Sequence, residues 1–153
     1  MRGWVLLSAL LLMTAGYQVP QPALAPLRSR VVDWNTLVPT ETRTGQRRDV
    51  FDGPTGTLDR LHGHITTLNP GENTGPLHRH PQEEMVIIKE GTVEVNIDGR
   101  KQVAGAGSIV FFGVNENENM TNVGRKPATY LVLQWFTPLT PKSRAEWRRS
   151  VSE

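Results

Sequence analysis

Short runs of apolar and β-branched residues recur along most of the chain, and they predict strands rather than long helices. Each run is followed within two residues by Gly, Asn or Pro, and evenly spaced short strands with such turn residues are typical of a β-sandwich or barrel. The Asp98-Gly99 pair favours the positive φ angles of a tight hairpin. The pattern therefore predicts an all-β domain. The runs cover residues 58–68, 85–89, 92–97, 108–112 and 128–136.

The two ends of the chain depart from this pattern. Residues 26–56 are polar and irregular, and we expect an N-terminal arm with at most short strands there. Near the C-terminus, Thr140 can cap a helix that runs from Pro141 through Trp147. The expected organisation is therefore an N-terminal arm, a β-barrel domain, and a C-terminal helix and tail. The last two cover residues 57–137 and 138–153.

The first 25 residues have the pattern of a secretory signal peptide. Arg2 precedes an apolar run over residues 4–15 that is too short to span a membrane. Ala23-Leu24-Ala25 supplies small residues for cleavage, and a cut near Gly16 is the alternative. We therefore predict that residues 1–25 are removed and that the mature protein is exported to the periplasm or the extracellular space. An uncleaved N-terminal anchor helix is the competing interpretation.

The composition excludes several kinds of site. The 153 residues contain no cysteine, which excludes disulfides, iron–sulfur clusters, cysteine-ligated zinc and thiol nucleophiles. Any metal must therefore be held by nitrogen and oxygen. The chain has 17 Lys and Arg residues against 15 Asp and Glu residues, and this near balance gives no basic surface for nucleic acid. The expected partner is a small-molecule ligand, with no nucleic acid and no membrane after signal cleavage.

The four histidines form two His-x-His pairs, His62/His64 and His78/His80. Residues i and i+2 of a strand point to the same face, so either pair can present two imidazoles to one point. The second pair also has a carboxylate close behind it, because a turn after His80 lets Glu84 open an antiparallel strand. Two imidazoles and one carboxylate suit Fe(II), Mn(II), Ni(II) or Zn(II) and leave coordination positions open.

The other pair has no such carboxylate. Alternation along its strand places Arg60, His62, His64 and Thr66 on one face. That face lines the mouth of the barrel, contributes to a dimer interface, or is an ordinary hydrogen-bonded surface.

The segment around the second pair resembles the first signature motif of the cupin superfamily. The spacing from His78 through Glu84 to Gly91 matches that motif, whereas Gly71 lies one residue farther from His78 than usual. The resemblance implies the cupin fold, a double-stranded β-helix that forms a jelly-roll barrel. It also implies a homodimer, because cupins commonly pair through sheet edges and terminal arms. His78, His80 and Glu84 are then the expected metal ligands.

Residues 99–124 resemble the second cupin motif in their glycines, their apolar strand and Asn122. The important departure is Glu118, which occupies the position where cupins normally place a fourth metal ligand, a histidine. If Glu118 binds, the second carboxylate favours Mn(II), Fe(II) or Mg(II) over Cu or Ni. If it does not bind, Glu118 is a candidate catalytic base beside a three-ligand metal. A third alternative is a site for an organic ligand without metal.

These observations predict an exported cupin that binds a divalent metal, Mn, Fe or Zn, and acts on a small organic substrate such as a sugar or an organic acid. Single-domain cupins include dioxygenases, isomerases, epimerases and lyases, so the resemblance does not fix the reaction. A metal-dependent dioxygenase or isomerase is the enzymatic interpretation. The alternative is a non-catalytic module that binds a sugar or a similar ligand without turnover.

Overall fold

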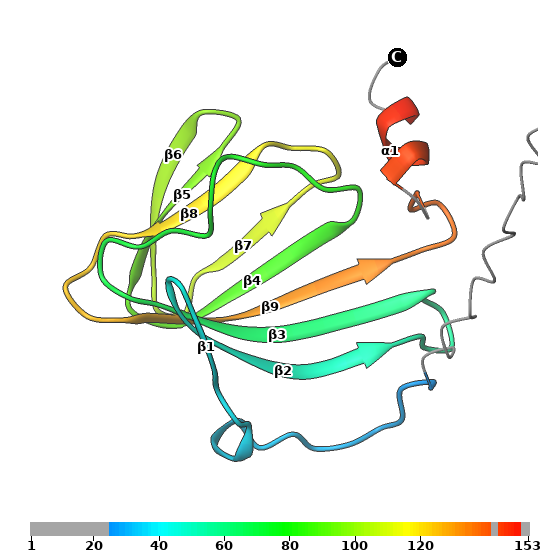
Figure 1. Ribbon diagram of the computed structural model, residues 1–153, viewed down its shortest axis with the longest axis horizontal. Coiled ribbons are helices and arrows are strands. Elements are labelled where there is room, and N and C mark those ends of the chain that lie inside the picture. Colours follow the sequence, from blue (N-terminus) through cyan, green and yellow to red (C-terminus); the bar gives the residue numbers. More distant parts are fainter. Residues whose placement is uncertain (1–24, 142–143, 151–153) are drawn as a thin grey trace, which may run out of the picture.

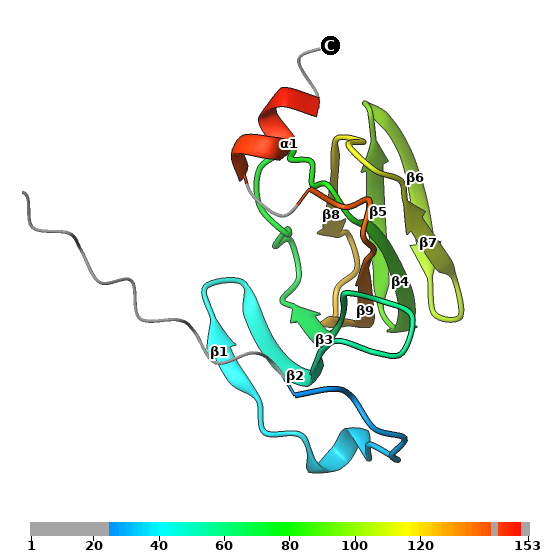
Figure 2. The ribbon, with the colours of Figure 1, turned by 90° about the vertical axis from the view of Figure 1, so that its right-hand side faces the viewer.

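The computed structural model of the chain describes residues 25–141 and 144–150 (Figure 1). The described residues form nine strands in two antiparallel sheets, with the orders β1-β2-β3-β9-β4-β7 and β6-β5-β8. Figure 2 shows the smaller sheet facing part of the larger one, so the predicted all-β jelly-roll fold is confirmed. The strands are β1 (Thr40–Thr42), β2 (Gly45–Gly53), β3 (Arg60–Leu68), β4 (Glu83–Glu90), β5 (Thr92–Ile97), β6 (Arg100–Gly105), β7 (Ile109–Phe112), β8 (Glu118–Asn122) and β9 (Ala128–Phe136).

The hydrophobic core lies between the two sheets and follows from alternation along the strands. On β4, Glu84, Val86 and Ile88 are buried, whereas the residues between them are half-buried. The strand therefore turns one acidic side chain toward the same interior as its apolar neighbours. The buried apolar cluster consists of Leu68, Val86, Ile88, Val93, Val95, Ala104, Val110, Phe112, Met120, Ala128, Tyr130 and Val132.

The predicted hairpin at Asp98-Gly99 is confirmed. Asp98 has φ 49° and Gly99 has φ 84°, as the two central positions of a type I′ turn require. Ile97 and Arg100 are paired directly across this turn, which fixes the register of β5 against β6.

The expectation of at most short strands in residues 26–56 is wrong. β2 covers nine residues, Gly45–Gly53, and pairs antiparallel with β3. The polar composition of β2 gave no apolar alternation from which a strand could be predicted. Its charged side chains are instead paired with residues on the same or the next strand: Arg47 contacts Asp49, and Asp52 contacts Arg60.

Two other segments also differ from the expected strands. β8 is missing from the apolar runs because two of its three buried side chains, Glu118 and Asn122, are polar. His78 and His80 were expected on a strand, but they lie in the loop of residues 69–82, where His78 forms an isolated antiparallel bridge with Glu118.

The C-terminal helix is present, but it is displaced from its expected position. α1 covers Arg144–Ser150, and a short 3-10 helix, η1, covers Trp34–Thr36. Thr140 does not cap α1, because its Oγ1 accepts a hydrogen bond from the Thr137 N–H at 2.9 Å. The Trp147 Nε1–H donates to the side-chain oxygen of Asn115, which ties the helix to the loop before β8.

The predicted signal peptide falls outside the described residues, except for Ala25. Neither helix in the described part of the chain has the length and the apolar character that crossing a bilayer requires.

Gly91→Ala is expected to lower the free energy of unfolding by about 3 kcal/mol. The substitution forces a residue with a side chain into a left-handed backbone conformation, and the new Cβ also overpacks its surroundings. Gly91 has φ 86°, and a Cβ there would lie 2.5 Å from the Ala128 Cα. Gly99→Ala is the matched control, because Gly99 has φ 84° but a Cβ there has no neighbour within 4 Å. It should cost about 1 kcal/mol. Urea denaturation tests the difference, and equal losses for the two variants would contradict it.

Candidate metal centre

A cavity of about 290 Å³ opens on the inner face of the six-stranded sheet. Its walls come from β1, β2, β3, β4 and β9 of that sheet, from β8 of the smaller sheet, and from the loop of residues 69–82. His78, Glu84 and Glu118 line it. The cavity therefore brings Glu118 of β8 next to His78 and Glu84, which lie more than 30 residues earlier in the sequence.

Backbone pairing between the loop and β8 places the first histidine opposite Glu118. The His78 N–H donates to the Glu118 carbonyl at 3.1 Å, and the Glu118 N–H donates back to the His78 carbonyl at 2.7 Å. Directly opposed residues of an antiparallel pair point their side chains to the same face. The His78 Nε2 accordingly lies 2.9 Å from the Glu118 Oε1.

Both imidazoles are oriented through their Nδ1 atoms. The Nδ1 of His78 lies 3.0 Å from the Pro76 carbonyl oxygen, and that of His80 lies 2.7 Å from the Gln82 carbonyl oxygen. A carbonyl oxygen only accepts, so each Nδ1 donates. The His78 Nε2 also donates, to the carboxylate of Glu118, whereas the neutral His80 ring carries its lone pair on Nε2. This is the tautomer in which a histidine coordinates a metal through Nε2 while the backbone fixes the ring.

The two carboxylates of the site are buried, with Glu84 8% and Glu118 4% exposed. The Gln134 amide donates to the Glu84 Oε2 at 2.5 Å. Burial raises the pKa of Glu84 to about 7, and the nearby Glu118 charge adds to the effect. The hydrogen bond with Glu118 raises the pKa of His78 to about 9. Both groups therefore hold protons that a cation would replace, so rising pH favours cation binding.

The residues present fit a divalent metal ion. The ligand atoms of His80, Glu84 and Glu118 all lie within 4.8 Å of one another. The His80 Nε2 is buried without a hydrogen-bond partner, 3.7 Å from the Glu84 Oε2 and 3.8 Å from the Glu118 Oε1. A buried polar atom without a partner is costly, and two carboxylates can neutralise a divalent charge. His78 contacts this group through Glu118.

All four predicted ligands thus lie together, although the compact group of three includes Glu118 and leaves out His78. Whether Glu118 is a ligand or a base remains a prediction. The sequence analysis missed Gln134, which positions Glu84, and Arg47 and Tyr130, which line the cavity. Gln134 interrupts the apolar run of residues 131–136, and that interruption was the available signal.

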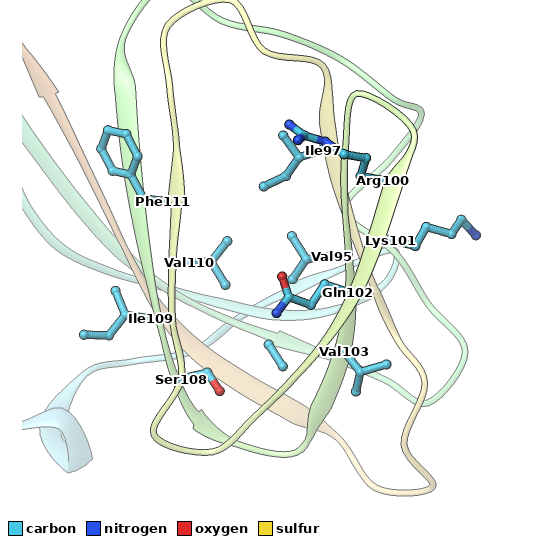
Figure 3. Close-up of a pocket in the computed structure, with 11 residues that line it drawn as sticks. Val95, Ile97, Arg100, Lys101, Gln102, Val103, Ser108, Ile109, Val110 and Phe111 are labelled. Atoms are coloured by element: carbon cyan, nitrogen blue, oxygen red, sulfur yellow. The ribbon is translucent and has the colours of Figure 1, made fainter.

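A second, larger hollow of about 730 Å³ lies between the β5–β6 hairpin and β7. Figure 3 shows Val95 and Val110 pointing toward one another across it, whereas Lys101 points away. The described residues that line it include no His, Asp or Glu. The groups with metal-binding chemistry are therefore in the smaller cavity.

Comparisons with known proteins agree with this architecture. The family described as Cupin domain matches residues 64–134. A relative from Streptomyces cyaneus, described as polyketide synthase CurC, is 30% identical over 118 residues, which cover 76% of this chain and 74% of the relative.

Solved structures similar to this chain include three that each fall below 25% identity, so the likeness concerns the fold. The polyketide cyclase RemF from Streptomyces resistomycificus has a TM-score of 0.59 at 19% identity, covering 81% of this chain and 94% of its own. KdgF from Halomonas sp. has a TM-score of 0.60 at 15% identity, covering 70% and 94%. The cupin domain of Schizosaccharomyces pombe Cnp3 has a TM-score of 0.64 at 10% identity, covering 80% and 82%.

Replacing His80 should abolish stoichiometric metal binding. We expect His80→Ala to weaken the affinity for Mn(II), Fe(II) or Zn(II) by more than about a hundredfold. Loss of a residue that only hydrogen-bonds to a metal ligand already weakens metal affinity by about 10–100-fold, and His80 is itself an expected ligand. His62→Ala is the control, because it removes an imidazole from the other pair. Elemental analysis and titration of protein purified without chelator measure the effect. Equal metal content in both variants would place the metal elsewhere.

The cavity wall also carries a pH-dependent contribution to stability. Burial, aided by the Arg47 charge, lowers the pKa of His64 to about 3, so His64 stays neutral when folded and takes a proton when unfolded below about pH 6.5. Its contribution is present above pH 6.5 and is lost as the pH falls toward 3. His64→Gln should therefore reduce the fall in unfolding free energy between pH 6 and 4 by up to about 1.4 kcal/mol per pH unit. Denaturation of metal-free protein tests this, and unchanged slopes would refute it.

Proposed function

The chain belongs to the cupin superfamily, and from this premise we propose that it is a metal-dependent enzyme that removes and returns a proton next to a carbonyl group of a small organic substrate. The observation that carries the proposal is the His80 Nε2, which is buried without a hydrogen-bond partner and faces the carboxylates of Glu84 and Glu118. His78 completes the donor set that the cavity offers.

When bound, a divalent metal would polarise the oxygen atoms of the substrate and so acidify the neighbouring C–H bond. His78, His80 and Glu84 would hold it. Gln134 fixes the orientation of the Glu84 carboxylate, and the two backbone carbonyls behind the imidazoles fix the rings. Preorganised ligands of this kind need little rearrangement when the ion binds.

Glu118 is the group that would move the proton. Its Oε1 faces His78 and His80, which leaves Oε2 to take a proton from the substrate carbon. The electron pair of the broken C–H bond moves into the adjacent carbonyl. In an α-hydroxycarbonyl substrate, return of the proton to the former carbonyl carbon gives an isomer, while the hydroxyl proton of the neighbouring carbon passes to the former carbonyl oxygen. The step needs no oxidant. If the carbanion instead attacks a second carbonyl of the same molecule, a ring forms.

The similar proteins support a substrate with several carbonyl oxygens. CurC is described as a polyketide synthase and RemF as a polyketide cyclase, and polyketide chains carry repeated carbonyl groups. This supports a polycarbonyl substrate over a simple sugar.

Hydrogen–deuterium exchange into hydroxyacetone, followed by NMR in D₂O, tests the proposal. Metal-loaded protein should accelerate exchange at the carbons next to the carbonyl, and Glu118→Gln should slow the catalysed rate by about 10²–10⁴-fold. Glu83→Gln is the matched control, because Glu83 is the neighbour of Glu84 and alternates to the other face of β4. The metal content of each variant separates loss of a base from loss of a ligand.

The alternatives give different results in the same assay. Oxygen uptake on addition of substrate would indicate a dioxygenase. Binding of metal and substrate without exchange would indicate a module that binds its ligand without turnover, and either result would refute the proposed reaction.

Export and a homodimer are also part of the proposal. The apolar run that follows Arg2 supports export to the periplasm or the extracellular space. The exposed side chains of Ile109 and Phe111, which lie on the face of β7 that points away from the core, support pairing with a second copy.

A further inference from the structure

We propose that Arg47 and Tyr130 form a second subsite on the β2 and β9 wall of the cavity, which binds an anionic oxygen group of the substrate. The inference rests on the proposed function, which places the metal-binding oxygens of the substrate at the other end of the cavity. The residues that carry it belong to the β2, β3 and β9 wall of the cavity and include no predicted metal ligand.

Tyr130 supplies a hydroxyl that makes no hydrogen bond of normal geometry among the described residues, although Thr66, its neighbour on β3, interacts with it and lowers its pKa slightly against the effect of burial. The residue is 1% exposed and lines the cavity, and its hydroxyl is buried without a hydrogen-bond partner. Burial, reinforced by the charges of Glu84 and Glu118, raises the pKa of Tyr130, so the hydroxyl keeps its proton. A buried hydroxyl without a partner is unfavourable unless a ligand oxygen accepts its hydrogen bond.

Arg47 supplies the charge. Among the described residues that line this cavity, Arg47 is the one Lys or Arg. Its Nη2 lies 2.9 Å from the His62 Nε2, and because a guanidinium only donates, His62 accepts. Its Nε donates to Asp49 at 2.9 Å, but Asp49 has a side chain 79% exposed, where water screens its charge.

A chain of contacts holds the guanidinium in place. Arg60 binds both carboxylate oxygens of Asp52, at 2.6 and 2.7 Å, and Asp52 lies 3.5 Å from the His62 Nδ1. The His64 Nδ1 lies 3.2 Å from the His62 Nε2. Burial lowers the pKa of both His62 and His64, so neither imidazole adds charge at neutral pH. The positive charge at this end of the cavity therefore belongs to Arg47.

The charges at the two ends of the cavity then indicate the chemical class of the ligand. A divalent ion would neutralise the carboxylates of Glu84 and Glu118 and leave the Arg47 charge unmatched within the cavity. A guanidinium and a phenol donor that line the same cavity suit a carboxylate or an acidic enol oxygen better than a neutral hydroxyl. The substrate class inferred from this is a polycarbonyl molecule that carries one acidic group apart from its metal-binding oxygens.

Binding of 3,4-dihydroxybenzoate and of its methyl ester to Zn(II)-loaded protein tests the inference. The two hydroxyl groups of this probe can bind the metal, and the carboxylate lies on the other side of the ring. The wild-type protein should prefer the acid over the ester by about tenfold or more. Arg47→Met should reduce that preference to within about twofold, and Tyr130→Phe should weaken binding of both probes.

Arg48→Met is the matched control, because it removes the same charge from the next residue of β2, which does not line the cavity. It should keep the wild-type preference. Arg47→Lys keeps the charge, provides a second variant if Arg47→Met fails to fold, and should retain part of the preference. A wild-type protein that binds acid and ester equally, or an Arg47→Met variant that still prefers the acid, would overturn the inference.

The zinc content of each variant separates this inference from the proposed function. If zinc binds and the preference survives in Arg47→Met, the subsite is refuted while the metal centre stands. If zinc does not bind, the proposed function fails, and the same comparison is made on metal-free protein with benzoate and methyl benzoate. A preference for benzoate that depends on Arg47 would still support the subsite, and its absence would refute it.

Discussion

A pair of backbone hydrogen bonds between His78 and Glu118 positions the site within the fold. These bonds join the loop of residues 69–82 to β8, and so connect the chain leaving the six-stranded sheet to the three-stranded sheet. The same loop is bonded to β8 farther along, at Gly71 and Thr74. Bonds that join the loop to β8 therefore also bring an imidazole and a carboxylate face to face.

The burial of two acids beside a hydrophobic core then determines what surrounds them. Glu84 and Glu118 are buried among residues such as Val86 and Met120, where an unpaired charge is strongly unfavourable. Hydrogen bonds from Gln134 and His78 offset part of the unfavourable free energy of burying these two carboxylates. Protonation of the carboxylates or a bound cation offsets the rest. Stability that a fully apolar core would provide has been given up at this end of the barrel, as is common at functional sites.

The sequence predicted those parts of the fold in which apolar alternation is regular, such as β5 and β9, and the hairpin whose φ angles Asp98-Gly99 favours. It did not predict β2 or β8, because their inward side chains include Arg47 and Glu118, whose partners come from other strands. The spacing of His78, His80 and Glu84 indicated that these residues lie together, although the strand geometry assumed for the two histidines was wrong. Gln134 and Tyr130 could not be predicted, because their roles arise from the register of β9 against β3 and β4, which pairs residues that are distant in the chain.

The exposed end of the larger sheet has a different consequence. β7 is the last strand of the six-stranded sheet, and Ile109 and Phe111 on it are 66% and 52% exposed. An unpaired strand edge with apolar side chains is a template for aggregation. Two features oppose this: β7 has only four residues, and Arg100 and Lys101 lie on β6 across the neighbouring groove. This exposed edge strand contributes nothing to the lining of the cavity that holds His78, Glu84 and Glu118, so changes on its outer face can alter association of the protein without altering that lining.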